Sequence, residues 1–174
     1  MSRRTKFVMI VIAAVSCLLI SLGIQRGLAM ASDESSVNAD VTVVSPANES
    51  YGALVIDARE TLLAWLALGV PDYLFATVFR NGGMEIELEA AVPDAAVISI
   101  WGSNVGFQHS NVKVSVSENE KRWQKIASLK IQSLENRRYD IYGSFGNVRY
   151  IKVERSGTPF SFLMLDAVRA KVGD

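Results

Sequence analysis

The feature that most constrains this chain is a strict alternation of apolar and polar residues in several short segments. In Met84–Glu89 (MEIELE), the apolar residues occupy every second position and three glutamates occupy the positions between them. Val112, Val114 and Val116 repeat this pattern further along the chain. A period of two places the apolar side chains on one face of a strand, so the pattern favours sheets with one buried face.

Segments of this kind recur along the chain and are separated by turn residues. The expected strands are Val41–Val44, Met84–Glu89, Ala96–Trp101, Val112–Val116, Arg122–Ser128, Tyr139–Tyr142, Val148–Glu154 and Phe162–Val172. Their short, turn-rich spacing favours antiparallel connections over strand–helix–strand units. We therefore predict an all-β fold, an antiparallel jelly-roll β-sandwich of about eight strands.

One segment has the pattern of a short helix instead. Asp57–Gly69 (DARETLLAWLALG) contains good helix formers, a capping-box spacing between Asp57 and Glu60, and Gly69 as a stop. This helix would be apolar on nearly all sides, so it either plugs one end of the sandwich or contacts another chain or a membrane surface. The residues available for a protein contact are Leu62, Trp65, Leu66 and Phe75.

The N-terminus carries the pattern of an export signal. Arg3, Arg4 and Lys6 precede the uncharged apolar run Phe7–Ile24, and Ala29–Ala31 resembles a cleavage site. The run is also just long enough to remain as a membrane-anchor helix. Both alternatives place the rest of the chain outside the cytoplasm, secreted or at the cell surface. The expected organisation is a signal peptide or anchor (1–31), a polar linker (32–47) and one domain (48–174).

Composition argues against several classes of function. The only cysteine, Cys17, lies in the apolar run, so the domain has no disulfide. Four of the 18 basic residues precede Ser32, which leaves 14 basic against 18 acidic residues and a net charge of −4 beyond it. Nucleic acid is therefore not an expected partner. One histidine and no G-x-S-x-G motif remove the common nucleophilic and zinc sites, so we expect no enzyme.

Four segments between residues 50 and 172 carry a resemblance to a known fold family. They are ALGVPD (Ala67–Asp72), SENEKRW (Ser117–Trp123), VRYIKVE (Val148–Glu154) and LDAVRA (Leu165–Ala170). The second is similar to an S-x-D-G-x-x-W hairpin and the third to an A-R-Y-[VI]-[RK]-[VI] strand. In this order they resemble the galactose-binding-like β-sandwich of discoidin domains and many carbohydrate-binding modules. Asn119-Glu120 stands in place of Asp-Gly, which predicts a less tight turn.

The resemblance implies a role in binding rather than in catalysis. It implies carbohydrate, or a surface glycoconjugate, as the ligand and places Trp123 in the core. It also implies a structural Ca²⁺, for which Asp166 and an acid of an early loop such as Asp57 would supply oxygens. No other cofactor is expected.

The alternation singles out Trp101 as a binding residue. If Ile98 and Ile100 point inward, Trp101 ends its strand on the wet face, where its ring can stack on a sugar or a partner's side chain. The loop that follows offers hydroxyl, amide and imidazole groups for hydrogen bonds. The predicted ligand-binding residues are Trp101, Ser103, Asn104, Gln108 and His109. In the alternative interpretation, Trp101 covers the sandwich edge and His109 is a solvated loop residue.

These observations predict an exported, non-catalytic binding module, with carbohydrate as its ligand. The alternative is a structural or adhesive protein–protein module of a surface or envelope assembly, with its contact in the apolar region 62–79.

Overall fold

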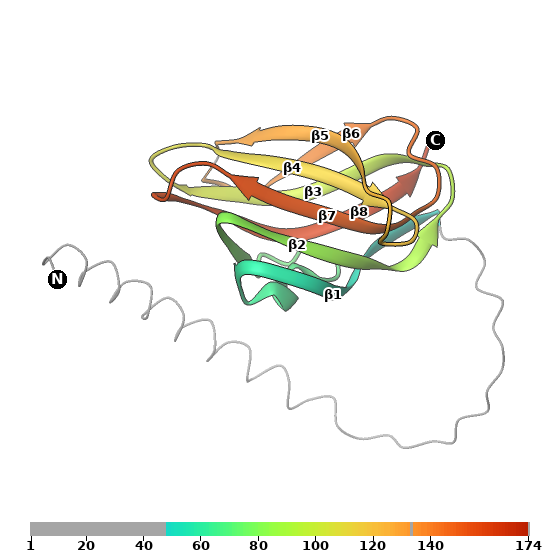
Figure 1. Ribbon diagram of the computed structural model, residues 1–174, viewed down its shortest axis with the longest axis horizontal. Coiled ribbons are helices and arrows are strands. Elements are labelled where there is room, and N and C mark those ends of the chain that lie inside the picture. The colour runs from blue at the N-terminus through green and yellow to red at the C-terminus, as the bar shows by residue number, and fades with distance from the viewer. Residues whose placement is uncertain (1–47, 133, 174) are drawn as a thin grey trace, which may run out of the picture. The chain divides into compact units, whose positions relative to one another are not determined.

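The computed structural model describes residues 48–132 and 134–173, which form eight strands and one 3-10 turn (Figure 1). The elements are β1 (Glu49–Leu62), η1 (Ala64–Ala67), β2 (Ala76–Val92), β3 (Ala95–Gly106), β4 (Ser110–Ser117), β5 (Gln124–Ile131), β6 (Arg137–Tyr142), β7 (Val148–Ser156) and β8 (Ser161–Val172). Within these residues, no helix is long and apolar enough to cross a membrane. The predicted signal or anchor, the linker and the strand Val41–Val44 lie outside the described residues.

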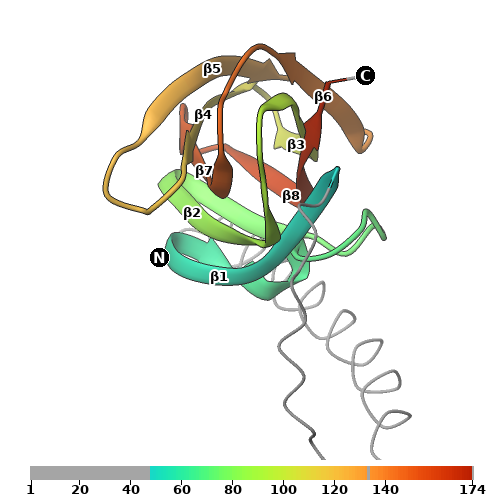
Figure 2. The ribbon, with the colours of Figure 1, turned by 90° about the vertical axis from the view of Figure 1, so that its right-hand side faces the viewer.

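The strands form one hydrogen-bonded sheet that folds over into two layers (Figure 2). Their order is β5-β4-β7-β2-β1-β8-β3-β6, and every pairing is antiparallel, as predicted. β2 belongs to both layers, because Gly83–Glu87 pair with β7 whereas Ala76–Val78 pair with β8. The two layers are therefore joined through backbone hydrogen bonds as well as through the core.

The core lies between the layers and contains the apolar residues that the alternating sequence pattern predicts to face inward. Its fully buried members include Met84, Ile86 and Leu88 of β2, Ile98 and Ile100 of β3, and Val112, Val114 and Val116 of β4. Each such side chain stabilises the fold by roughly 1.5–3 kcal/mol relative to an exposed position. The prediction that Ile98 and Ile100 point inward is confirmed.

The predicted helix over Asp57–Gly69 is wrong for all but one turn. The first half of this segment belongs to β1, where Asp57 pairs with Glu85 of β2. The chain leaves the strand through Leu63, which has a φ of 55°, and only Ala64–Ala67 coil, as a 3-10 turn. Pairing with β2 continues to Leu62 at the end of β1, with bulges along the way, so tertiary context outweighs the helix propensity of these residues.

The β4–β5 hairpin agrees with the resemblance in its backbone, but the tryptophan that follows it lies elsewhere than predicted. Glu120 has a φ of 61°, so the position where the resemblance expects glycine keeps a left-handed backbone. Trp123 was predicted to lie in the core but is only half-buried, with the Lys152 ammonium 5.1 Å from its ring centroid. Lys152 lies between the inward-facing Ile151 and Val153, so this contact is on the outer face of the sheet.

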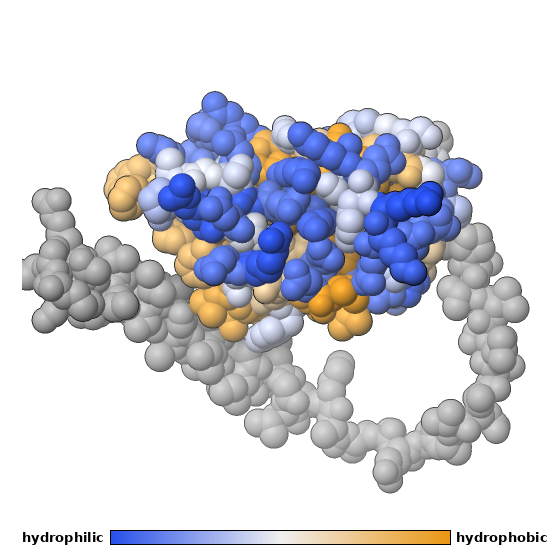
Figure 3. All heavy atoms as spheres, viewed as in Figure 1, coloured by the Kyte–Doolittle hydropathy of each residue, from blue (hydrophilic) through white to orange (hydrophobic). Residues whose placement is uncertain are grey.

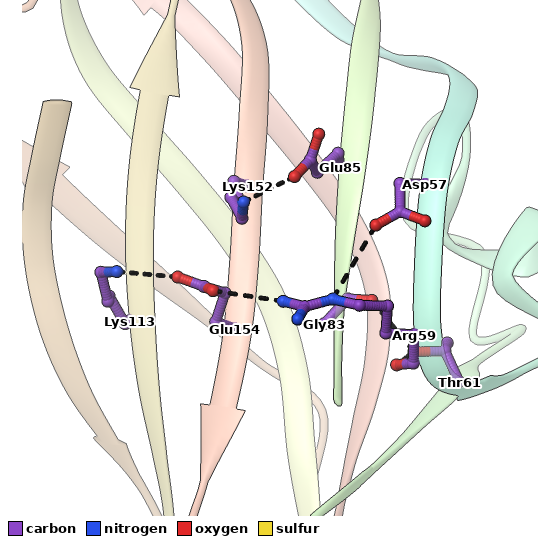
Figure 4. A network of polar contacts seen from close by, with 8 residues as sticks. All are labelled: Asp57, Arg59, Thr61, Gly83, Glu85, Lys113, Lys152 and Glu154. Carbon is purple, nitrogen blue, oxygen red and sulfur yellow. Dashed lines mark hydrogen bonds and ion pairs between the residues drawn. The ribbon is translucent and has the colours of Figure 1, made fainter. Parts of the chain in front are cut away.

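Ion pairs run across the outer face of β4, β7, β2 and β1 (Figure 4). Glu154 of β7 lies between two cations, with one carboxylate oxygen 2.8 Å from Lys113 Nζ and the other 3.5 Å from Arg59 Nη2. Lys152 pairs with Glu85 beside them at 2.5 Å. The charges of this face are therefore mutually compensated across β4, β7, β2 and β1.

Replacing Glu154 with glutamine would remove its ion pairs with Lys113 and Arg59. The free energy of unfolding at pH 7 is expected to fall by only about 0.5–1 kcal/mol, because the side chain is partly exposed to water. The hydrogen bond from Lys113 is the main cause that lowers the pKa of Glu154 below 4.5. A lowered carboxyl pKa stabilises the fold above the ordinary pKa and loses this effect as the pH falls through the folded-state pKa. Urea unfolding of both proteins should thus show a difference at pH 7 that vanishes at strongly acidic pH. A difference that is independent of pH would contradict this prediction.

Candidate functional site

The outer face of the second layer carries a cluster of aromatic and charged side chains around Trp101. The strand register places Ser99 of β3 between Arg169 of β8 and Asp140 of β6, and places Trp101 opposite Arg138. Tyr51 of β1 lies opposite Arg169 on its other side. We call this surface the Trp101 face; its residues are Glu49, Tyr51, Ser99, Trp101, Arg138, Asp140, Tyr142 and Arg169.

Arg169 holds the two central aromatic rings of this face together. Its guanidinium carbon lies 5.8 Å from the ring centroid of Tyr51 and 5.3 Å from that of Trp101. The two ring centroids are 6.2 Å apart, with 35° between the ring planes. The two distances from the guanidinium to the rings fall within the range of cation–π attraction, so Arg169 holds both rings in position.

Further polar contacts fix Arg169 and the neighbouring acid. Arg169 Nη1 is 3.1 Å from Glu49 Oε2, and Nη2 donates to Ser99 Oγ at 3.2 Å. Ser99 in turn donates to Asp140 Oδ1 at 2.7 Å, while Arg138 Nη2 is 3.0 Å from Asp140 Oδ2. The chain of contacts crosses all four strands of the face. It holds these polar groups in place before any ligand arrives.

The aromatic surface continues at the edge of the sheet. Tyr142 ends β6 opposite Val97 and is 75% exposed. Since residues two apart share a face of a strand, its ring lies on the same side as Asp140. The Trp101 face therefore combines three aromatic side chains with two acids and two arginines. Such a surface offers rings for stacking and polar groups for hydrogen bonds.

The structure separates the predicted ligand-binding residues. Trp101 is half-buried on the outer face, as the alternation predicted, whereas Ser103 and Asn104 are buried. Gln108 is exposed and His109 half-buried in the loop that joins β3 to β4. Asn104 Nδ2 donates to the Gln108 carbonyl at 2.7 Å and its Oδ1 accepts from Ser110 Oγ at 2.6 Å. The Asn104 side chain is thus engaged in shaping that loop.

The two predicted calcium ligands lie in different surroundings. Asp57 is an exposed residue of β1, 3.9 Å from Arg59 Nε. Asp166 is fully buried in β8 and accepts hydrogen bonds from the backbone amides of Asp72 and Tyr73, both at 3.2 Å, and from Asn136 Nδ2.

Burial raises the pKa of Asp166 above 3.8, and the hydrogen bonds from Asp72, Tyr73 and Asn136 oppose that rise. In residues 48–132 and 134–173, no group of three or more His, Cys, Asp or Glu side chains could hold a metal ion. The bound calcium ion stays a prediction.

Sequence reasoning missed most of the Trp101 face. Tyr51 falls in a segment that the sequence does not predict to be a strand, and Arg169 falls in a predicted strand without a predicted role in binding. Asp140 and Arg138 alternate with inward residues of β6, which is the signal that could have placed them on the wet face. The register that brings residues 51, 101, 140 and 169 together is long-range, and no local pattern encodes it.

The chain has the fold of the galactose-binding-like β-sandwich, so the predicted fold is confirmed. A pectin-binding carbohydrate-binding module matches with a TM-score of 0.51 and 15% identity, over 68% of this chain and 89% of that one. A family 29 carbohydrate-binding module matches with a TM-score of 0.53 and 11% identity, over 73% and 94%.

A family 32 module of a family 31 glycoside hydrolase from Clostridium perfringens is also similar. It matches with a TM-score of 0.51 and 13% identity, over 67% of this chain and 94% of that one. Neither a family model nor a curated protein sequence matches the chain. The likeness to these three structures is one of fold.

Proposed function

We propose that this protein is a non-catalytic carbohydrate-binding module whose ligand lies on the Trp101 face. The observation that carries the proposal is the Tyr51–Arg169–Trp101 arrangement, in which one guanidinium fixes two aromatic rings on an outer sheet face. Aromatic rings can stack on the C–H surface of a sugar, while charged side chains hydrogen-bond its hydroxyl groups. The carbohydrate-binding modules with the same fold, one of them described as pectin-binding, support this class of ligand.

The proposed role is binding alone. The two carboxylates of the Trp101 face, Glu49 and Asp140, are each paired with an arginine. Glycoside hydrolysis needs one carboxyl group to donate a proton and a second to act as base or nucleophile, whereas both carboxylates of this face are engaged by arginine side chains. The arrangement supports recognition of a sugar without its cleavage.

The proposal places this module outside the cytoplasm, secreted or at the cell surface. Its support is the N-terminal pattern of Arg3, Arg4 and Lys6 followed by the apolar run Phe7–Ile24. If the run stays in the membrane, it would anchor the module there.

Trp101→Ala is expected to weaken carbohydrate binding by at least about 30-fold, since a central aromatic anchor contributes about 2 kcal/mol or more. A glycan array followed by isothermal titration with the best ligand would measure the change. Trp65→Ala is the matched control, because Trp65 is 60% exposed and lies in η1, outside the Trp101 face. Equal losses in the two variants, or no glycan bound by folded wild-type protein, would contradict the proposal.

A second candidate function rests on an exposed apolar surface over β1 and η1. Hydrophobic residues are visible along the lower side of Figure 3, where β1 and η1 lie in Figure 1. Trp65 and Leu62 are exposed, whereas Leu66 is buried and Phe75 half-buried. Of the four residues predicted for a protein contact, the two exposed ones could thus meet a partner without rearrangement.

This surface would serve a structural or adhesive module of a surface or envelope assembly. Analytical ultracentrifugation of wild-type protein and Trp65→Ala tests this candidate. Association that the variant abolishes would favour it, and a monomer at all concentrations would count against self-assembly.

A further inference from the structure

One end of the sandwich is closed by two loops that bridge the layers side by side. The β3–β4 loop and the β7–β8 loop both lie at the left end in Figure 1. The register explains their proximity, because Gly106 at the end of β3 lies opposite Ser161 of β8, and Asn111 of β4 lies opposite Ser156 of β7. The strands joined by one loop pair with the strands joined by the other, so the two loops lie next to each other.

Arg155 lies beneath these loops as a buried cation. It is the penultimate residue of β7 and only 2% exposed. Its Nε donates to Ser110 Oγ at 2.8 Å. Its Nη2 donates to the Thr158 carbonyl at 3.0 Å and to the Ser161 carbonyl at 2.6 Å. The same nitrogen is 2.9 Å from Ser161 Oγ. Arg155 therefore ties the first residues of β4 and β8 to the loop between β7 and β8.

The second terminal nitrogen of Arg155, Nη1, makes none of these hydrogen bonds. Nη1 is buried and has no hydrogen-bond partner in the described part of the chain. The partners of the other nitrogens are neutral carbonyl and hydroxyl groups, and no carboxylate among the described residues lies within 4.0 Å of the guanidinium.

Burial and a neighbouring positive charge both destabilise the charged form of Arg155. Burial lowers the pKa of Arg155 below its ordinary value, and the charge of Arg80 lowers it further. A buried charge without a partner is expensive, and leaving one of its donors unpaired adds to that cost. Both Arg155 and Arg80 would be stabilised by a negative group placed at Nη1.

We propose that this end of the sandwich binds an oxyanion, a carboxylate or sulfate group, with Arg155 Nη1 as its principal donor. The planar guanidinium matches the geometry of such groups, and a water molecule would satisfy the donor without compensating the charge. The site is distinct from the Trp101 face and does not depend on the carbohydrate proposal. Its ligand is either an inorganic oxyanion or an acid group on a larger organic molecule.

Because Nη1 is buried, binding at this donor requires the β7–β8 loop to move. Gly157, with a φ of 144°, begins the loop that bonds to Arg155 through the Thr158 carbonyl. Access requires this bond to break, together with the 3.2 Å contact between Thr158 Oγ1 and Ser161 Oγ that also holds the loop. Phe107 is 99% exposed and Phe160 is 71% exposed, one on each loop. They offer apolar contacts that an organic acid would use and an inorganic ion would not.

The test follows the Arg155 Nε–H signal and the backbone amides of residues 157–161 by ¹H–¹⁵N NMR of the wild-type protein. Sodium sulfate is the inorganic probe, sodium galacturonate the organic one, and sodium chloride at the same ionic strength the control. NMR is preferred to melting temperature, because sulfate stabilises most folded proteins by exclusion from their surface. We expect saturable shifts with sulfate, with galacturonate or with both, at a Kd of about 10 mM or lower.

Each pattern of shifts has a meaning. Shifts with galacturonate alone would assign the site to organic acids, and shifts with sulfate at equal or higher affinity would assign it to inorganic oxyanions. No saturable shift with either probe, or the same shifts with chloride, would overturn the proposal.

Variants distinguish binding of the anion at Arg155 from general electrostatic attraction of anions to the protein. Arg155→Met should abolish the shifts but removes structural hydrogen bonds as well, so Arg80→Gln is the second variant. Arg80 is exposed, and its replacement should weaken binding about two- to threefold while leaving every bond of Arg155 intact. Arg122→Gln removes the same charge in the β4–β5 hairpin, at the other end of β4, and should leave the affinity unchanged. Equal weakening by both glutamine variants would overturn the local assignment.

Discussion

Replacing Asp166 with alanine is expected to lower the free energy of unfolding by about 3–4 kcal/mol. The change would leave three hydrogen-bond donors without their acceptor, namely the backbone amides of Asp72 and Tyr73 and the side-chain amide of Asn136. For a domain of this size, the melting temperature should fall by roughly 10–15 °C. Urea unfolding measures the first quantity and calorimetry the second.

The control for this variant is Asp57→Ala. Asp57 is exposed and makes only a long ion pair with Arg59, so its loss should change the stability by about 0.5 kcal/mol or less. Hydrogen exchange adds a local readout, because amides in residues 70–75 should lose protection in the Asp166 variant alone. Similar stabilities of the two variants would show that the contacts of Asp166 contribute little.

The pH dependence of the same residue has a definite sign. Burial raises the pKa of Asp166 in the folded state, so the folded protein binds its proton before the unfolded chain does. Stability from this group is therefore greatest at low pH and falls as the pH rises through the interval from 3.8 to the folded-state pKa.

Asp166→Asn removes this titration. Wild-type protein should therefore gain stability relative to Asp166→Asn on acidification. A relative loss would mean that the three hydrogen bonds outweigh burial and hold the pKa of the carboxyl group below its ordinary value.

Gly106→Ala is expected to cost about 3 kcal/mol or more, because the new methyl group would meet backbone atoms that cannot move independently. A Cβ at this position would lie 2.3 Å from the Phe160 carbonyl oxygen and 2.6 Å from Ser161 Cα. The φ of 133° adds strain for any residue other than glycine. Chemical denaturation measures the loss, and calorimetry would detect it as a lower melting temperature.

Gly146→Ala separates the steric clash from the backbone strain. Gly146 also has a positive φ, of 66°, but no heavy atom lies within 4 Å of the position a Cβ would take. This variant should lose only about 1 kcal/mol, from left-handed backbone strain. Equal losses at Gly106 and Gly146 would show that the loops closing the Arg155 end yield easily to a side chain.

The strands of the core could be predicted because each carries its own signal. Met84, Ile86 and Leu88 alternate with glutamates, and valines alternate with polar residues in β4, so burial of one face can be read locally. β1 could not be predicted in this way. Its residues between Asp57 and Leu62 favour a helix when isolated, and their strand conformation follows from pairing with β2.

The candidate site shows the same division between local and long-range information. Trp101 was placed on the outer face because its two inward neighbours, Ile98 and Ile100, define the phase of the strand. Its partners Tyr51 and Arg169 come from strands at opposite ends of the domain sequence, so only the register unites them. Asp166 was marked as a residue of interest, but its N–H donors come from two separate loops that no pattern links to β8.

The two ends of the described domain leave from paired positions. Val172 N donates to the Asn48 carbonyl at 2.8 Å, and Glu49 lies opposite Lys171 in antiparallel register. A mechanical pull applied between these ends would load the β1–β8 bonds one after another, as in opening a zipper, rather than together in shear. Glu49–Tyr51 of β1 would then peel away from β8 at low force, because the β1–β8 pairing spans these three residues. A domain stretched between its termini would yield first at the strand that carries Tyr51, and the aromatic arrangement would be lost before the core opened.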